Sequence, residues 1–130
     1  MFNLSLQLNK MSFNTRQMRP SDLRFTQDTI KAEFENGENV NKKIRQLCGL
    51  DSYTLALRLQ SFQPLEVAKC RNDGQWYCNN NRRLYMFRAL EFAGKLHSVK
   101  VSHVLELLML KPMQPMQLHW APRHGVWVDY

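Results

Sequence analysis

The chain contains no apolar run that approaches the ~20 residues needed to cross a membrane as a helix. It also lacks a C-x-x-C pair, and its three cysteines, Cys48, Cys70 and Cys78, do not have the spacing of a zinc site. We therefore expect neither a transmembrane segment nor a resident metal. Reduced thiols fit an intracellular protein, with the cytoplasm or nucleus favoured. Cys70 and Cys78 flank a predicted turn, however, which leaves a disulfide as the alternative.

Acidic side chains are absent from the first 19 residues. Lys10, Arg16 and Arg19, with polar residues between them, make this segment weakly similar to an organelle transit peptide. The alternating apolar residues from Phe2 to Leu8 instead indicate a strand. We prefer an ordered or semi-ordered extension, with an organelle as the alternative location.

The balance of charge is basic, with 18 Lys and Arg against 11 Asp and Glu and a net charge of +7. Hydrophobic residues make up 44% of the 130 residues and charged residues 22%, which are values typical of a single globular domain. A basic excess attracts polyanions such as nucleotides, nucleic acid or an anionic membrane. A basic surface without such a partner is the alternative.

Hydrophobic spacing and turn residues predict both strands and helices. The expected strands cover 23–26, 65–70, 75–78 and 99–101, with an Asp-Gly hairpin turn at 72–74. The expected helices run from Asn39 or Asn41 to Gly49, from Asp51 or Ser52 to Pro64, from Arg82 to Phe92, and from Ser102 to Leu110. Thr26 or Asp28 would cap a further short helical turn before Ile30. The fold class is thus α/β (α+β): one domain with a small mixed sheet and packed helices.

Three regions follow from this pattern. Residues 1–19 form the N-terminal extension, residues 20–101 the domain, and residues 102–130 a C-terminal helix followed by an aromatic tail. The tail is too apolar to be free, so we expect it to pack on the domain or to bind a partner, either another protein or a second copy of the chain.

The stretch that indicates a function is a strand, a polar loop and a helix start. Asn80, Asn81, Arg82 and Arg83 stand where the first N–H groups of the helix lack internal partners and the helix dipole is positive. An anion satisfies such an end, amides donate to it, and guanidinium groups bind phosphate oxygens in pairs. These four residues are therefore predicted to bind phosphate. Solvated arginines in the first helical turn are the alternative interpretation.

Several other residues carry weaker predictions. Trp76 and Tyr77 alternate along the preceding strand, so one would lie in the core and the other would be able to stack on a base. Asp28 is read as a cap rather than as a distant catalytic carboxylate. The acidic residues between Glu33 and Glu38 are read as a solvated turn, with cation binding through a substrate as the alternative.

The run from Gly74 to Leu90 resembles the signature of the ParB/sulfiredoxin superfamily, as does the upstream run from Leu23 to Ile30. Partition proteins of this superfamily read G-E-R-R at the motif, sulfiredoxins read G-C-H-R, and a eukaryotic group reads roughly D-N-R-R-L. This chain reads N-N-R-R-L from Asn80 to Leu84. The resemblance covers about residues 20–101. It implies nucleotide phosphates at the motif loop, a nucleoside triphosphate (CTP or ATP) with Mg²⁺ as ligand, and Arg83 as the arginine shared by all versions.

The motif departs from the superfamily at the positions that carry its chemistry. Asn81 replaces the sulfiredoxin cysteine and the partition-protein glutamate, and an amide is neither a nucleophile nor a general base. Sulfinic-acid reduction is therefore not expected. Weak nucleotide hydrolysis or phosphotransfer stays open, and no catalytic residue is assigned. The alternatives to a nucleotide-phosphate-binding domain are a basic nucleic-acid-binding or nuclease module and a non-catalytic subunit of a larger assembly.

Overall fold

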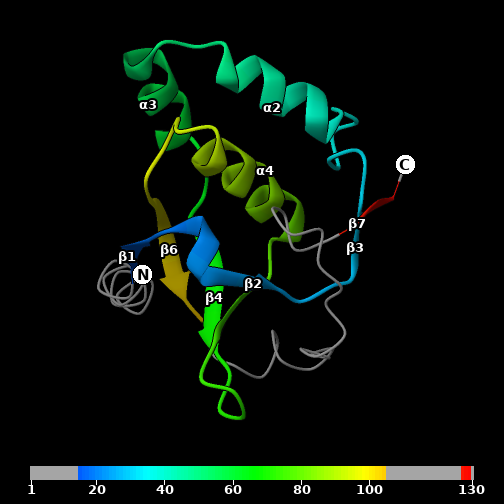
Figure 1. Cartoon of the computed structure of the whole chain (residues 1–130), viewed down its shortest axis with the longest axis vertical. Coiled ribbons are helices and arrows are strands. Elements are labelled where there is room, and N and C mark those ends of the chain that lie inside the picture. Colours follow the sequence, from blue (N-terminus) through cyan, green and yellow to red (C-terminus); the bar gives the residue numbers. More distant parts are fainter. Residues whose placement is uncertain (1–14, 105–126, 130) are drawn as a thin grey trace, which may run out of the picture.

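The computed structural model describes residues 15–104 and 127–129, and it shows a mixed α/β fold (Figure 1). Its elements are β1 (Thr15–Met18), the 3-10 helix η1 (Pro20–Asp22), β2 (Leu23–Phe25), β3 (Thr29–Lys31), α2 (Val40–Cys48), α3 (Ser52–Gln60), β4 (Leu65–Lys69), β5 (Trp76–Cys78), α4 (Asn81–Phe92), β6 (Val99–His103) and β7 (Trp127–Asp129). Five strands form one sheet in the order β1-β6-β4-β5-β2, and β3 and β7 form a second, two-stranded sheet. The expected fold class is confirmed.

The five-stranded sheet is built around β4. This strand pairs antiparallel with β5 and parallel with β6, while β2 joins β5 in parallel and β1 joins β6 antiparallel. The β4–β5 hairpin turns at the predicted Asp-Gly pair, where Gly74 adopts a positive φ of 69° that a side chain would disfavour. The Cys70 N–H donates to the Gln75 carbonyl there, whereas Cys78 pairs with Val67. Cys70 and Cys78 therefore do not face each other, and both are free thiols.

Local capping residues fix where α2 and α3 begin. The Asn39 side chain accepts a hydrogen bond from the Lys42 N–H at 2.9 Å, and Asp51 accepts one from the Thr54 N–H at 2.8 Å. Each cap satisfies one of the N–H groups that a helix start leaves without a partner. Of the alternatives given by the sequence, Asn39 and Asp51 are thus the caps, and the predicted helix positions are confirmed.

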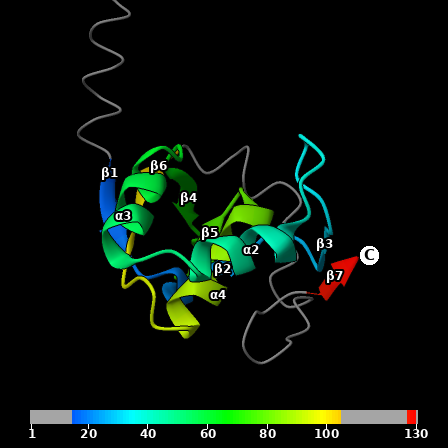
Figure 2. The same ribbon diagram turned by 90° about the horizontal axis from the view of Figure 1, so that it is seen from above.

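The central element is α4, which lies between α2 and the sheet (Figures 1 and 2). Leu84, Met86 and Leu90 are completely buried, and so are Phe25, Val67 and Tyr77 of the sheet. A helix that is buried on most of its faces places its two ends firmly in the molecule. The N-terminal end of α4 is consequently a fixed point of the fold.

Two expectations about strands and helices were wrong. Residues 29–31 form a strand rather than following a helical turn, because Ile30 is buried between the exposed Thr29 and Lys31. Ser102 does not cap a helix: it lies within β6 and pairs with Thr15. That pairing also brings part of the expected N-terminal extension, Thr15–Met18, into the sheet. The remainder of the helix expected up to Leu110 and the alternating residues 2–8 lie outside the described residues.

The end of the described chain returns to the domain. Trp127–Asp129 pair in parallel with Thr29–Lys31, and the two strands lie side by side in both views, apart from the larger sheet (Figures 1 and 2). No described helix combines the length and the apolar character that a membrane span requires.

Candidate functional site

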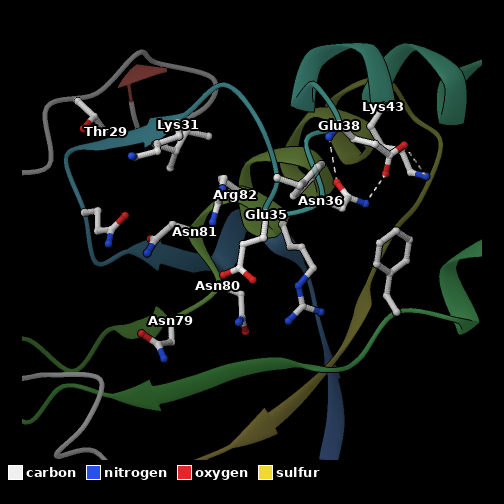
Figure 3. Close-up of a pocket in the computed structure, with 15 residues that line it drawn as sticks. Thr29, Lys31, Glu35, Asn36, Glu38, Lys43, Asn79, Asn80, Asn81 and Arg82 are labelled. Carbon is white, nitrogen blue, oxygen red and sulfur yellow. Dashed lines mark hydrogen bonds and ion pairs between the residues drawn. The ribbon is translucent and has the colours of Figure 1, made fainter. Parts of the chain in front are cut away.

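A pocket of about 960 Å³ opens in front of the N-terminus of α4 (Figure 3). One wall is β3 with the loop that follows it, and the opposite wall is the loop before α4 with the first turn of this helix. The second wall consists of residues 79–83, and the lining is completed by Lys43 and Phe62. The structure therefore places all four predicted phosphate-binding residues at one pocket.

The start of α4 is not capped. Asn80 is its N-cap residue, but the Asn80 side chain accepts no hydrogen bond from the helix, and no acid stands in the first turn. The first helical hydrogen bond runs from the Leu84 N–H to the Asn80 carbonyl at 2.9 Å. Within the described part of the chain, no acceptor engages the N–H groups of Asn81, Arg82 and Arg83, so these donors and the positive end of the helix dipole are left for a ligand.

The two asparagines hold this loop in place. Asn81 is buried, its Oδ1 accepts from the Thr26 N–H, and its Nδ2 donates to the Thr26 hydroxyl, both at 2.9 Å. Asn80 Oδ1 accepts from the Glu66 N–H at 2.8 Å. Both polar atoms of the Asn81 amide thus form hydrogen bonds with Thr26, the residue that follows β2. Its side chain anchors the motif, and Asn81 also belongs to the lining of the pocket.

The two arginines are both half-buried and both line the pocket. Arg82 donates to the carbonyl of Glu33, and Arg83 donates to the carbonyl of Gln63. Burial lowers the pKa of Arg83, while Cys78 and Glu66 act in the opposite direction. Neither guanidinium group forms an ion pair within residues 15–104 or 127–129. Two guanidinium charges thus stand at the positive end of a helix without an ion pair to a described carboxylate.

The other charged groups of the pocket are lysines and glutamates. Lys43 forms an ion pair with Glu38 at 3.5 Å, and the hydrogen bond from Asn36, followed by the charge of Lys43, lowers the pKa of Glu38. Lys31 stands on β3, and Glu35 extends from the next loop toward the start of α4 (Figure 3). With Arg82 and Arg83, the lining holds four cations and two carboxylates, so its net charge is positive.

The aromatic residues of β5 are not part of this pocket. Tyr77 is completely buried and donates its hydroxyl hydrogen bond to Asp73, so its ring cannot stack on a base. Trp76 is half-buried and contacts Arg16 and His103 instead. The residues predicted to bind phosphate therefore line the pocket, whereas the residues predicted to stack on a base lie outside it.

The thiol closest to the motif in sequence is Cys78. It is completely buried, its Sγ accepts from the Asn80 N–H at 3.4 Å, and burial raises its pKa to about 12. A neutral, buried thiol is not a nucleophile. The described residues also hold no group of three or more metal-ligating His, Cys, Asp or Glu side chains.

Sequence reasoning missed the wall opposite the motif. Lys31 and Lys43 were not assigned to a site, and Glu35 was read as part of a solvated turn. No local pattern marks these residues, because the path of the chain after β2 brings them to α4. Searches with the sequence and the structure find no matching protein-family model, no matching curated protein and no matching solved structure.

Proposed function

We propose that the pocket at the start of α4 binds the phosphate groups of a nucleotide. The observation that carries this proposal is the uncapped first turn of α4, with Arg82 and Arg83 free of ion pairs among the described residues, opening into a pocket of about 960 Å³. Ligand pockets of small molecules typically measure about 300–1,000 Å³. The space is thus of the size that a nucleoside triphosphate needs.

Some residues of the motif bind phosphate, and others hold the loop in place. The N–H groups of residues 81–83 bind phosphate oxygens, and Arg82 and Arg83 add charged donors from the same turn. Asn81, through its two hydrogen bonds to Thr26, fixes the loop that presents these donors. Lys31 on the opposite wall neutralises further phosphate charge. The resemblance of N-N-R-R-L to the ParB/sulfiredoxin motif supports this assignment.

The proposal concerns binding rather than turnover. The thiol of Cys78 is buried and neutral, and the Asn81 amide is engaged. Among the described residues, Glu35 is the pocket carboxylate without an ion pair, and it is the group to test if hydrolysis or phosphotransfer is detected. Mg²⁺ would enter as part of the Mg²⁺–nucleotide ligand, with CTP and ATP as the two candidates.

The test is isothermal titration of the full chain with Mg²⁺–CTP and Mg²⁺–ATP, using Arg83→Gln and the matched control Arg45→Gln. Arg45 is exposed on α2 and does not line the pocket, whereas glutamine at position 83 keeps a donor for the Gln63 carbonyl. A charge-assisted hydrogen bond contributes about 1.5–3 kcal/mol, so Arg83→Gln should weaken binding about 10- to 100-fold. The proposal would be refuted if the wild type gave no binding signal at millimolar nucleotide. It would also be refuted if the two variants bound nucleotide with equal affinity.

A further inference from the structure

Trp76 stands at the centre of a second cluster of side chains, away from the pocket. The guanidinium carbon of Arg16 lies 4.4 Å from the centroid of the Trp76 ring. The His103 ring meets the same ring edge-on, with 5.3 Å between centroids and 74° between planes. Lys69 is the direct cross-strand partner of Trp76. Four different strands, β1, β4, β5 and β6, thus bring an aromatic ring, two cations and an imidazole together.

A hollow of about 460 Å³ adjoins the Trp76 ring. It is lined by Met18, Ser21, Asp22, Leu23, Arg24, Gln75 and Trp76. Trp76 belongs to this lining, whereas Arg16 does not. Met18 supplies apolar contact, while Gln75 and Asp22 supply hydrogen-bonding groups. An aromatic wall with apolar contact and polar groups is suited to a flat heterocycle with polar edges.

The charge of the sheet points to the class of ligand. Two cationic strand residues stand beside Trp76, Arg16 against its ring and Lys69 as its cross-strand partner, and the one acidic residue of the five strands is Glu66. Glu66 belongs to the other site, since it accepts a hydrogen bond from Asn79 beside the start of α4. The surface around Trp76 therefore attracts a polyanion, and the half-buried tryptophan adds a ring on which bases can stack.

We propose that the surface formed by Arg16, Lys69, Trp76 and His103, here called the Trp76 surface, binds single-stranded nucleic acid. A base enters the hollow and stacks on Trp76, with its edge toward Gln75 and Asp22, while Arg16 and Lys69 contact phosphates. Proteins read single strands in this way because unpaired bases expose their flat faces to aromatic side chains. A base within a duplex is already stacked and cannot enter the hollow. This surface is independent of the nucleotide pocket at α4.

The experiment measures fluorescence anisotropy of a short fluorescein-labelled oligothymidylate with the full chain, over a series of salt concentrations. The wild type should bind with a logarithm of affinity that falls linearly with the logarithm of salt concentration. Trp76→Leu keeps an apolar side chain and removes the ring, and it should weaken binding by about 10- to 100-fold. Trp76→Phe keeps a ring and should retain most of the affinity.

Charge variants separate phosphate contact from general basicity. Lys69→Gln should reduce the salt slope by about one unit. Lys95→Gln removes an equal charge from an exposed lysine just after α4 and should leave the slope unchanged. If Trp76→Leu fails to fold, as judged by circular dichroism, the double variant Arg16→Gln/Lys69→Gln takes its place and should weaken binding at low salt more than Lys95→Gln does.

The outcomes are distinct. Binding by Trp76→Leu equal to that of the wild type overturns the proposal, as does equal or tighter binding of the matching duplex. Loss of oligonucleotide binding in Arg83→Gln with no loss in Trp76→Leu would place the oligonucleotide in the α4 pocket and also overturn it. If no nucleotide binding is measured but oligonucleotide binding depends on Trp76, the proposed nucleotide site at α4 is refuted. The proposal for the Trp76 surface is then supported.

Discussion

The helices α3 and α4 begin in opposite ways. The start of α3 is closed: Asp51 accepts hydrogen bonds from both the backbone and the side chain of Thr54, and its negative charge stands at the positive end of the helix. The start of α4 is open, with no capping bond and with Arg82 and Arg83 in its first turn. The two helices lie in one small domain, so the difference comes from their sequences and not from the general environment.

The difference shows that the start of α4 lacks the local stabilisation that a cap gives to the start of α3. A helix start without a cap, with positive charge beside it, is unfavourable on its own. In this protein the cost falls on the longest helix of the described chain, the one most deeply packed in the core. The packing of α4 holds the open start in place, and Asn81 is the side chain that ties this start to the sheet. The following four predictions test this comparison, in order of decreasing expected effect.

The largest effect is expected from Asn81→Leu. This change leaves the N–H and hydroxyl of Thr26 without their buried partner, and each such loss costs about 1–3 kcal/mol, so the free energy of unfolding should fall by about 3 kcal/mol. Urea denaturation followed by circular dichroism measures it. Asn79→Ala, which alters an exposed neighbour, is the control and should change stability by less than about 0.5 kcal/mol. Equal stability of the two variants would show that Asn81 does not anchor α4.

The second prediction gives α4 the acidic start of α3. Asn80→Asp keeps the oxygen that accepts from the Glu66 N–H, but it adds a negative charge where phosphate is proposed to bind. Nucleotide affinity should fall by about tenfold through repulsion, whereas the free energy of unfolding should rise by about 0.5 kcal/mol through the helix dipole. Titration calorimetry and urea denaturation measure the two effects.

The control for this change is Asn72→Asp, which adds the same charge in the exposed hairpin turn. It should alter neither quantity measurably. If Asn80→Asp bound nucleotide as well as the wild type, the open start of α4 would not be the phosphate site.

The third prediction concerns the other end of α4. Here the Gly94 and Lys95 N–H groups donate to the Glu91 and Leu90 carbonyls, both at 2.9 Å, and Gly94 has a φ of 76°. No atom lies within 4 Å of a Cβ added at this residue, so Gly94→Ala costs only backbone strain, about 1 kcal/mol of unfolding free energy. Thermal unfolding should show the loss, with nucleotide affinity unchanged.

Gly49→Ala is the matched control for Gly94→Ala, since Gly49 ends α2 with an ordinary φ of −80°. It should be tolerated better. A nucleotide affinity that changed with Gly94→Ala would mean that the two ends of α4 are coupled.

The smallest effect is a change in the pH dependence of stability. The hydrogen bonds from Thr54 lower the pKa of Asp51 below its ordinary value of 3.8. The ionised cap therefore stabilises the fold above that ordinary value, and the stabilisation is lost as the pH falls through the lowered pKa. Asp51→Asn keeps an amide cap that does not titrate, so its melting temperature should decline less steeply at acidic pH.

The reciprocal change, Asn39→Asp at the start of α2, should make the acid decline steeper. Melting curves across the acidic range measure both variants. Parallel curves for the wild type and Asp51→Asn would show that Asp51 contributes nothing to the acid sensitivity.

The parts of the fold that the sequence predicts correctly are those with local causes. The Asp-Gly turn, the caps at Asn39 and Asp51 and the helix that ends before Gly94 each depend on residues within one or two turns of each other. The mixed α/β class follows from the alternation of these segments. The position of the motif at a helix start was likewise predictable, because it depends only on where α4 begins.

The parts that were missed have distant causes. The hydrogen bonds between Asn81 and Thr26 could not be predicted, because the two residues lie 55 positions apart in the sequence. Thr29–Lys31 and Thr15–Met18 are too short for their alternation to stand out, and each becomes a strand through a partner far along the chain. Trp76 and the motif adjoin in sequence but face different sites, since a strand and the loop after it need not present their side chains to the same surface.

The pairing of β3 with β7 affects the order in which the protein folds. Thr29 near the beginning of the chain meets Trp127 near residue 130, and Thr15 meets Ser102. Contacts that close such long loops lose much chain entropy before they gain energy, so they form after local elements such as the β4–β5 hairpin. On the ribosome, Thr29–Lys31 must wait for its partner strand until residues 127–129 have emerged. The wall of the pocket that contains β3 is therefore completed only after residues 127–129 have been synthesised.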